Sequence, residues 1–140
     1  MTTASEALAV RALPLSSNAT APDGTEIRLL PRNPTVSMAH GTLPPNRVST
    51  AIRHKTVDEI WFVLDGSAEI WRRLGDVESI VRVEIGNSLT IPVGTCFQFR
   101  TRGDEPFRFI MCTTPPWTGD EEAEQVEGFW QGDHATHDAE

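Results

Sequence analysis

The fold of this protein is decided by the stretch HKTVDEIWFVLDG, residues 54 to 66. From Glu59 onward the residues are those that pleated strands favour, and Asp65-Gly66 is a tight-turn signal, so the stretch predicts a β-strand that ends in a turn. Successive side chains of a strand point to opposite faces, which places Glu59 and Trp61 on one face. If that face is the interior of a barrel, Glu59 and His54 enter it near the same end.

Short segments of the same kind recur along the chain, and turn signals rich in glycine and proline separate them. The expected strands cover residues 25–30, 35–40, 48–54, 59–64, 68–73, 79–85, 88–91, 96–101 and 107–113. Many short strands at even spacing, without a long helical period between them, indicate an antiparallel β-sandwich or barrel. Because no internal repeat is visible, we expect a single all-β barrel.

The chain has 140 residues, which is one domain's worth and enough to bury a core without disulfide or metal crosslinks. We expect three parts. An N-terminal arm covers residues 1–24, the barrel covers residues 25–113, and an acidic C-terminal tail covers residues 114–140. Within the arm, residues 4–13 have the composition of a short helix.

The net charge of −8 arises from the tail. Residues 1–112 hold 12 acidic and 12 basic side chains, whereas residues 113–140 hold eight acidic ones and no Lys or Arg. A neutral body with an acidic tail has no basic stripe to neutralise phosphates, which argues against nucleic-acid binding.

The tail also contains aromatic residues that a purely solvated segment does not need: Trp117, Phe129 and Trp130. We expect part of the tail to lie back against the barrel or against a second subunit, while residues 131–140 fray. A solvated segment is the simplest interpretation of the remainder, and docking on a regulatory partner is the alternative.

The sequence gives no reason to expect a membrane protein or a secreted one. No apolar run approaches the roughly 20 residues of a membrane span. The N-terminus lacks a basic start followed by an apolar core, so we expect a cytoplasmic protein. In a reducing compartment Cys96 and Cys112 are expected to be free thiols.

Two spacings in the sequence resemble the paired motifs of the cupin superfamily. The first motif is Gly, five residues, His, one residue, His, four residues, Glu, six residues, Gly; it falls on Asn46, Ile52, His54, Glu59 and Gly66. The second is Gly, five residues, Pro, one residue, Gly, two residues, His, three residues, Asn; it falls on Gly86, Pro92, Gly94, Phe97 and Thr101. The resemblance covers roughly residues 25–113 and implies a double-stranded β-helix, or jelly-roll barrel.

The resemblance also implies a divalent metal ion, but only half of the metal-binding positions are retained. A typical cupin uses two histidines and the glutamate of the first motif together with the histidine of the second. Here Ile52 and Phe97 occupy two of these positions, which leaves His54 and Glu59. An imidazole and a carboxylate suit Zn, Fe, Ni or Mn, yet two protein ligands give a weak and exchangeable site.

Three interpretations of His54 and Glu59 remain open. In the first, they bind a metal ion, and water and a substrate atom occupy its remaining coordination positions. In the second, they form a metal-free pair that binds a ligand or transfers a proton, and the carboxylate raises the histidine pKa and keeps both groups ionised. In the third, they are a buried hydrogen-bonded pair inherited from a metal-binding ancestor.

His40 is a poor candidate to complete a metal site. Residues 41–47 look like a hairpin connection that brings residues 40 and 48 together. His54 would then lie on the order of 20 Å along the partner strand. We therefore expect His40 at the surface or at the rim of the barrel.

Four further side chains are also poor candidates. Cys96 and Gln98 have the opposite parity to Phe97, so they should point away from the interior. His134 and His137 have the spacing of a helical metal-binding pair, but they lie in the acidic segment that we expect to fray.

Strand parity also predicts which residues line the barrel mouth. The candidate ligand-binding residues are Ile52, His54, Glu59, Trp61, Phe97, Phe99 and, on one of the two registers open to residues 107–112, Met111. An aromatic-lined cavity with two convergent polar groups suits a small, partly apolar molecule. The alternative for Phe97 and Phe99 is that their side chains only fill the barrel core and do not contact a ligand.

We therefore expect a small protein of cupin type that binds a small organic molecule and keeps a vestigial or weak metal site. The resemblance and the aromatic tail imply a homodimer. The alternative is a metal-dependent enzyme, such as a dioxygenase, isomerase or cyclase, in which His54 and Glu59 are the ligands and the candidate catalytic residues. A regulatory binding module that acts through its tail is the third hypothesis.

Overall fold

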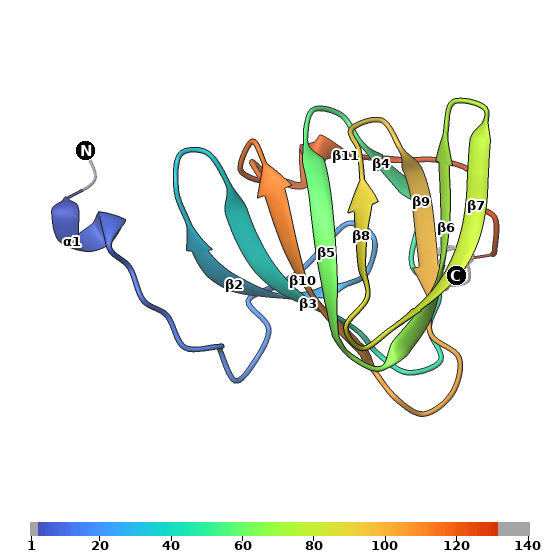
Figure 1. The fold of residues 1–140 in the computed structure, drawn as a ribbon, viewed down its shortest axis with the longest axis horizontal. Coiled ribbons are helices and arrows are strands. Elements are labelled where there is room, and N and C mark those ends of the chain that lie inside the picture. Colours follow the sequence, from blue (N-terminus) through green and yellow to red (C-terminus); the bar gives the residue numbers. More distant parts are fainter. Residues whose placement is uncertain (1–2, 132–140) are drawn as a thin grey trace, which may run out of the picture.

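The structure, a computed structural model, describes residues 3–131 apart from the side chain of Glu6, and it consists of two antiparallel sheets (Figure 1). The elements in chain order are α1 (Ala4–Ala7), β1 (Ala19–Thr20), β2 (Glu26–Arg32), β3 (Ser37–Leu43), β4 (Ile52–His54), β5 (Asp58–Asp65), β6 (Ser67–Leu74), β7 (Val77–Glu84), β8 (Ser88–Ile91), β9 (Cys96–Arg100), β10 (Phe107–Thr114), the 3-10 turn η1 (Asp120–Glu122) and β11 (Ala123–Gln125). One sheet has the order β1-β2-β3-β10-β5-β8 and the other has the order β11-β4-β9-β6-β7. The all-β barrel expected from the sequence is confirmed.

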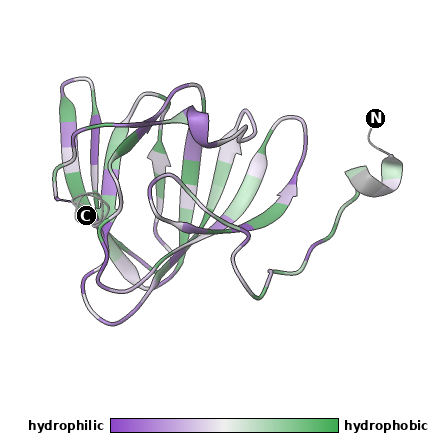
Figure 2. Cartoon of the chain, turned by 180° about the vertical axis from the view of Figure 1, so that it is seen from behind, coloured by the Kyte–Doolittle hydropathy of each residue, from purple (hydrophilic) through white to green (hydrophobic). Residues whose placement is uncertain are grey.

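The core lies between the two sheets. Hydrophobic and hydrophilic residues alternate along the strands (Figure 2), so the hydrophobic side chains of a strand share the face that is turned toward the core. Along β5 every second side chain is buried, as the sequence alternation predicts. Trp61 is at the centre of the core, where its ring stacks on Phe109 at 4.1 Å and meets the edges of Phe99 and Phe97 at 5.0 and 5.9 Å. The aromatic cluster therefore fills the barrel behind the mouth.

Turn positions explain why the motif spacings predict the fold. Gly66 joins β5 to β6 with φ at 75°, and a Cβ there would lie 2.1 Å from the carbonyl oxygen of Pro106. Asn46, which stands where the first motif has glycine, also has a positive φ of 53°. Asn is one of the few residues other than glycine that adopt this conformation readily, so the substitution keeps the turn.

The hairpin expected over residues 41–47 is wrong. β3 continues to Leu43 and pairs with β2 and β10, whereas β4 lies in the opposite sheet and pairs with β9 and β11. The chain therefore crosses between sheets here. The strand expected over residues 48–54 shortens to β4: Val48 joins Arg100 in an isolated bridge, and the regular pairing begins only at Ile52.

The first part of the N-terminal arm, with α1, projects from the barrel (Figure 1), whereas its last residues form β1, which pairs with β2, and reach the cavity wall. Its helix, α1, covers only four of the residues expected from 4–13, because a helix this short has no packing partner to stabilise it. The arm is held by the Arg28 side chain, which donates hydrogen bonds to the carbonyl oxygens of Pro14 and Leu15 at 2.9 and 3.2 Å. No helix of the described residues is long and apolar enough to span a membrane.

The chain after β10 lies back on the barrel, as expected for part of the tail. β11 pairs with β4. The Trp130 amide and carbonyl form hydrogen bonds with the Gln98 side chain, both at 2.8 Å, and the Arg100 guanidinium lies 4.3 Å from the Trp130 ring. The segment 132–140, with the two tail histidines, lies outside the described residues.

Candidate functional site

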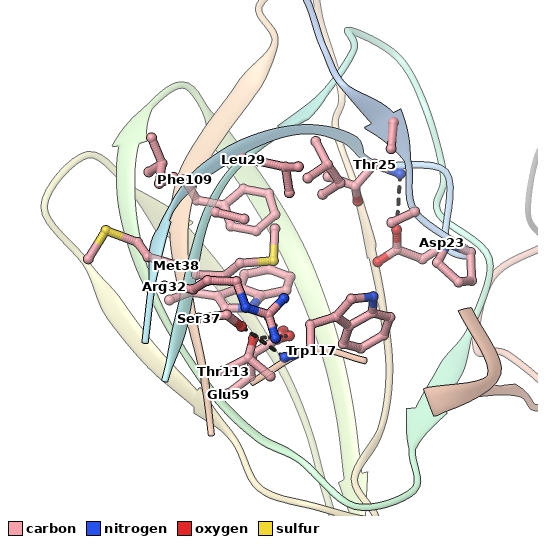
Figure 3. Close-up of a pocket in the computed structure, with 18 of the residues that line it drawn as sticks. Asp23, Thr25, Leu29, Arg32, Ser37, Met38, Glu59, Phe109, Thr113 and Trp117 are labelled. Atoms are coloured by element: carbon pink, nitrogen blue, oxygen red, sulfur yellow. Dashed lines mark hydrogen bonds between the residues drawn. The ribbon is translucent and has the colours of Figure 1, made fainter. Parts of the chain in front are cut away.

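A cavity of about 480 Å³ lies in the barrel mouth, among β2, β3, β4, β5 and β10 (Figure 3). Its apolar lining includes Ile27, Leu29, Ile52, Trp61, Phe109, Met111 and Trp117. Its buried polar lining includes Asp23, His54, Glu59 and Thr113. Gly41 on β3 leaves room for this arrangement, because a Cβ there would lie 2.7 Å from the Phe109 ring and 2.9 Å from the end of Met111.

Glu59 is the second residue of β5. Side chains alternate between the two faces of this strand, and Glu59 belongs to the buried set that faces the barrel interior. Its carboxyl group is buried and accepts hydrogen bonds from Trp61 Nε1 at 2.7 Å and from Thr113 Oγ1 at 3.1 Å. Burial raises the pKa of Glu59 to about 7, although the two hydrogen bonds favour the ionised form. The group therefore gains and loses a proton near neutral pH.

His54 ends β4 and reaches the same space from the opposite sheet. Its Nε2 lies 4.0 Å from Glu59 Oε2, and its ring meets the edges of Phe97 and Trp117 at 5.3 Å each. The buried Nδ1 has no hydrogen-bond partner among the described residues. Burial lowers the pKa of His54, against the attraction of Asp23 and Glu122, so the imidazole is neutral at pH 7.

The expectation that the carboxylate keeps both members of the pair ionised is wrong. The distance of 4.0 Å would allow an ion pair, but the pKa of His54 is lowered and that of Glu59 is raised. In both cases removal from water disfavours the charged form more strongly than a partner at this distance stabilises it.

Several residues of the site were not predicted from the sequence, and Asp23 and Trp117 are the two that matter most for its chemistry. Asp23, in the turn before β2, is 7% exposed and accepts a hydrogen bond from the Thr25 amide at 3.0 Å. Burial raises its pKa, and nearby Glu59 raises it further. Trp117 follows β10, donates its amide to Ser37 Oγ at 3.0 Å and covers His54. Asp23 looked only like a turn residue and Trp117 only like an apolar part of the tail.

The predicted lining residues fall into two groups. Ile52, Trp61 and Met111 line the cavity together with the pair of polar residues. Phe97 and Phe99 are 1% and 0% exposed and belong to the core cluster; they do not border the cavity, although Phe97 contacts the His54 ring.

His40 is not at the surface, which corrects the sequence-based expectation. It lies in the middle of β3, is 4% exposed and pairs with Ile110 across the strands. Cys96 and Gln98 are also buried, on the side of β9 that the returning tail covers. None of the three borders the cavity.

The cavity does not fit the four-ligand metal centre that the motifs imply. Ile52 and Phe97 are cross-strand neighbours and belong to the apolar core. Among residues 3–131, no three His, Cys, Asp or Glu side chains are placed to hold one ion. Of the four motif positions, only His54 and Glu59 carry side chains that can bind a metal ion, and the other two carry the hydrocarbon side chains of Ile52 and Phe97.

We expect protein incubated with Zn²⁺ or Mn²⁺ and then desalted to retain far less than one ion per chain, because two ligands give rapid exchange. Elemental analysis of the native protein and of His54→Ala measures this. About one ion per native chain that is lost in the variant would contradict the expectation and favour a metal centre.

The two facing antiparallel sheets, with a cavity at one end, define a double-stranded β-helix barrel. The family described as Cupin domain matches residues 39–113. The chain belongs to this family, as the motif spacings indicated.

Solved structures of similar fold include oxalate decarboxylase of Bacillus subtilis, with a TM-score of 0.66 and 14% identity over 79% of this chain and 30% of that chain. An uncharacterized conserved protein with a double-stranded β-helix domain from Klebsiella pneumoniae has a TM-score of 0.62 and 18% identity over 89% of this chain and 96% of that chain. These identities show the fold alone, and this chain spans about 30% of the decarboxylase. No curated protein matches the sequence.

Proposed function

We propose that this protein binds a small, partly apolar organic molecule in the barrel cavity, with His54 and Glu59 as its polar anchors. The observation that carries the proposal is the convergence of two buried ionisable groups in a mainly apolar cavity of about 480 Å³. Cavities of this size with a few convergent polar groups and perturbed pKa values are typical of small-molecule sites.

The same pair can move a proton to or from a bound molecule. Glu59 has a pKa of about 7, so both of its protonation states are populated near neutral pH. The neutral His54 can donate or accept a hydrogen bond at the same end of the cavity. We therefore propose, more specifically, that the pair carries out acid-base chemistry on the bound ligand.

The alternative function, a metal-dependent enzyme, has less support from the site. The similar Bacillus subtilis protein is described with Mn(II) centers. In this chain the donor set does not fit such a centre, so we propose no step through a metal. The metal analysis described above separates the two functions.

The neutral fluorescent probe N-phenyl-1-naphthylamine is expected to bind the native protein and to lose binding in Ala39→Trp. Ala39 lines the cavity, so an indole there would fill it. Thr90→Trp, at an exposed position of β8, is the matched control and should bind as the native protein does. Fluorescence titration measures both. Equal binding by the three proteins, or no binding by any, would count against the proposed site.

We also infer that the protein is a homodimer. The outer apolar face, defined as Met38, Ile60, Phe62 and Leu64, lies on the six-stranded sheet and is 40 to 56% exposed. On the projecting arm, Val10 and Leu15 are 97 and 100% exposed. A single chain leaves both surfaces in water, whereas a second copy can cover both by a two-fold contact.

A further inference from the structure

Two buried carboxyl groups in the cavity wall have no cationic partner. Asp23 and Glu59 are 7% and 4% exposed. In the described part of the chain neither forms an ion pair with Lys or Arg, and the His54 imidazole near Glu59 is neutral at pH 7. A buried carboxylate is costly unless a positive charge compensates it.

Carboxylates elsewhere on the barrel do have such partners. Glu69 accepts a hydrogen bond from Arg100 at 2.8 Å, and Asp65 accepts one from Arg108 at 2.9 Å. These pairs are partly exposed, where compensation matters less. Among residues 3–131, several surface acids thus have cationic partners whereas the two acids in the cavity form no ion pair with Lys or Arg, which points to a compensating charge from a bound molecule.

The turn before β2 does not by itself explain a carboxylate at position 23. Only Oδ1 of Asp23 accepts the Thr25 amide, and the side-chain oxygen of asparagine would do the same. The other oxygen, Oδ2, points toward the cavity (Figure 3).

The walls around these carboxyl groups suit a cation. The rings of Trp61, Phe109 and Trp117 line the cavity, and an aromatic face attracts an ammonium group, most strongly where water is excluded. The two arginines of the lining, Arg11 and Arg32, are exposed, so water and salt screen their repulsion of a cation placed deeper in the cavity.

Resting on the proposed function, we propose that the ligand is a small organic amine that binds as its ammonium ion, with Asp23 as the residue that selects for positive charge. Glu59 supplies the second carboxyl group, and the aromatic walls hold the apolar part of the molecule. The candidate ligands share an ammonium group attached to an aliphatic or aromatic hydrocarbon group.

The test uses three probes of one shape and different charge: benzylamine, benzyl alcohol and benzoate. Isothermal titration of the full-length protein at pH 8 is expected to give a Kd for benzylamine at least about tenfold lower than for benzyl alcohol, with benzoate weakest. Asp23→Asn keeps the acceptor for Thr25 and is expected to abolish the preference for benzylamine. Asp58→Asn, at an exposed position outside the cavity lining, is the matched control and should keep it, because Asp58 Oδ1 also accepts a backbone amide, that of Val93.

The outcomes separate this inference from the proposed function. If benzoate or benzyl alcohol binds most tightly, the cavity binds ligands but the ammonium inference is overturned. If all three fail to bind while N-phenyl-1-naphthylamine still does, the inference also fails and the proposed function stands. If both asparagine variants behave alike, Asp23 is not the selecting residue. Should Asp23→Asn fail to fold, Glu59→Gln must reduce the preference for benzylamine, and an unchanged preference overturns the proposal.

Discussion

Glu59→Gln is expected to be more stable than the native protein at pH 8, by up to about 3 kcal/mol, and equal to it near pH 4. Burial raises the pKa of Glu59 from 4.5 to about 7 in the folded protein. The folded state therefore binds the proton more tightly than the unfolded state does. Stability is lost as the pH rises from about 4.5 to about 7, and the full cost persists above that range.

Glutamine avoids this cost because it is never charged, and its amide can still form hydrogen bonds with Trp61 and Thr113. Urea unfolding at several pH values between 4 and 8 measures the difference between the two proteins. The difference is the useful quantity, since the burial that mainly raises the pKa of Asp23 is present in both proteins, and the variant loses only the smaller contribution of Glu59 to that pKa.

Glu69→Gln is the control of opposite sign. Glu69 is paired with Arg100 and Arg102, which lowers its pKa, so its ionised form stabilises the folded state. This variant should gain nothing at pH 8, and because the pair is partly exposed the loss should be small. A Glu59→Gln protein that is no more stable than the native one at pH 8, or a gain of the same size in the control, would contradict the assignment.

The second large effect concerns assembly. We expect the native protein to have twice the 15.5 kDa mass of the single chain in solution, and Phe62→Glu to have the single-chain mass. Phe62 lies in the outer apolar face and is 48% exposed, so a charge there would be buried without a partner in the dimer. Light scattering coupled to size-exclusion chromatography measures both masses.

Ile80→Glu is the matched control for this experiment. Ile80 has a similar exposure of 45% but lies on β7, in the five-stranded sheet. It should leave the dimer intact. A native protein with the single-chain mass at every concentration, or equal disruption by both variants, would exclude the outer apolar face as the interface.

The fold could be predicted because its signals are local. Alternation along residues 59–64 predicts a half-buried strand without knowledge of its neighbours. The positions of Gly66 and Asn46 predict turns, because few residues adopt a positive φ. The crossing between β3 and β4 could not be predicted, since a connection of this length fits either a hairpin or a change of sheet.

The site was only half predictable from the sequence. Motif spacing and strand parity brought His54 and Glu59 to one space, where the structure places them 4.0 Å apart. The ionisation of the pair was predicted wrongly, because a pKa depends on how much water surrounds a group and not on its neighbour alone.

The sequence by itself determined a single all-β barrel, the convergence of an imidazole and a carboxyl group at its mouth, and the loss of two of the family's metal-binding positions to Ile52 and Phe97. Only the tertiary structure decided that Asp23 and Trp117 complete the cavity and that, among residues 3–131, Asp23 and Glu59 form no ion pair with Lys or Arg. The reason is that strand periodicity and turn conformation depend on adjacent residues. Burial and charge compensation depend on segments that are far apart in the chain and meet only when the two sheets pack.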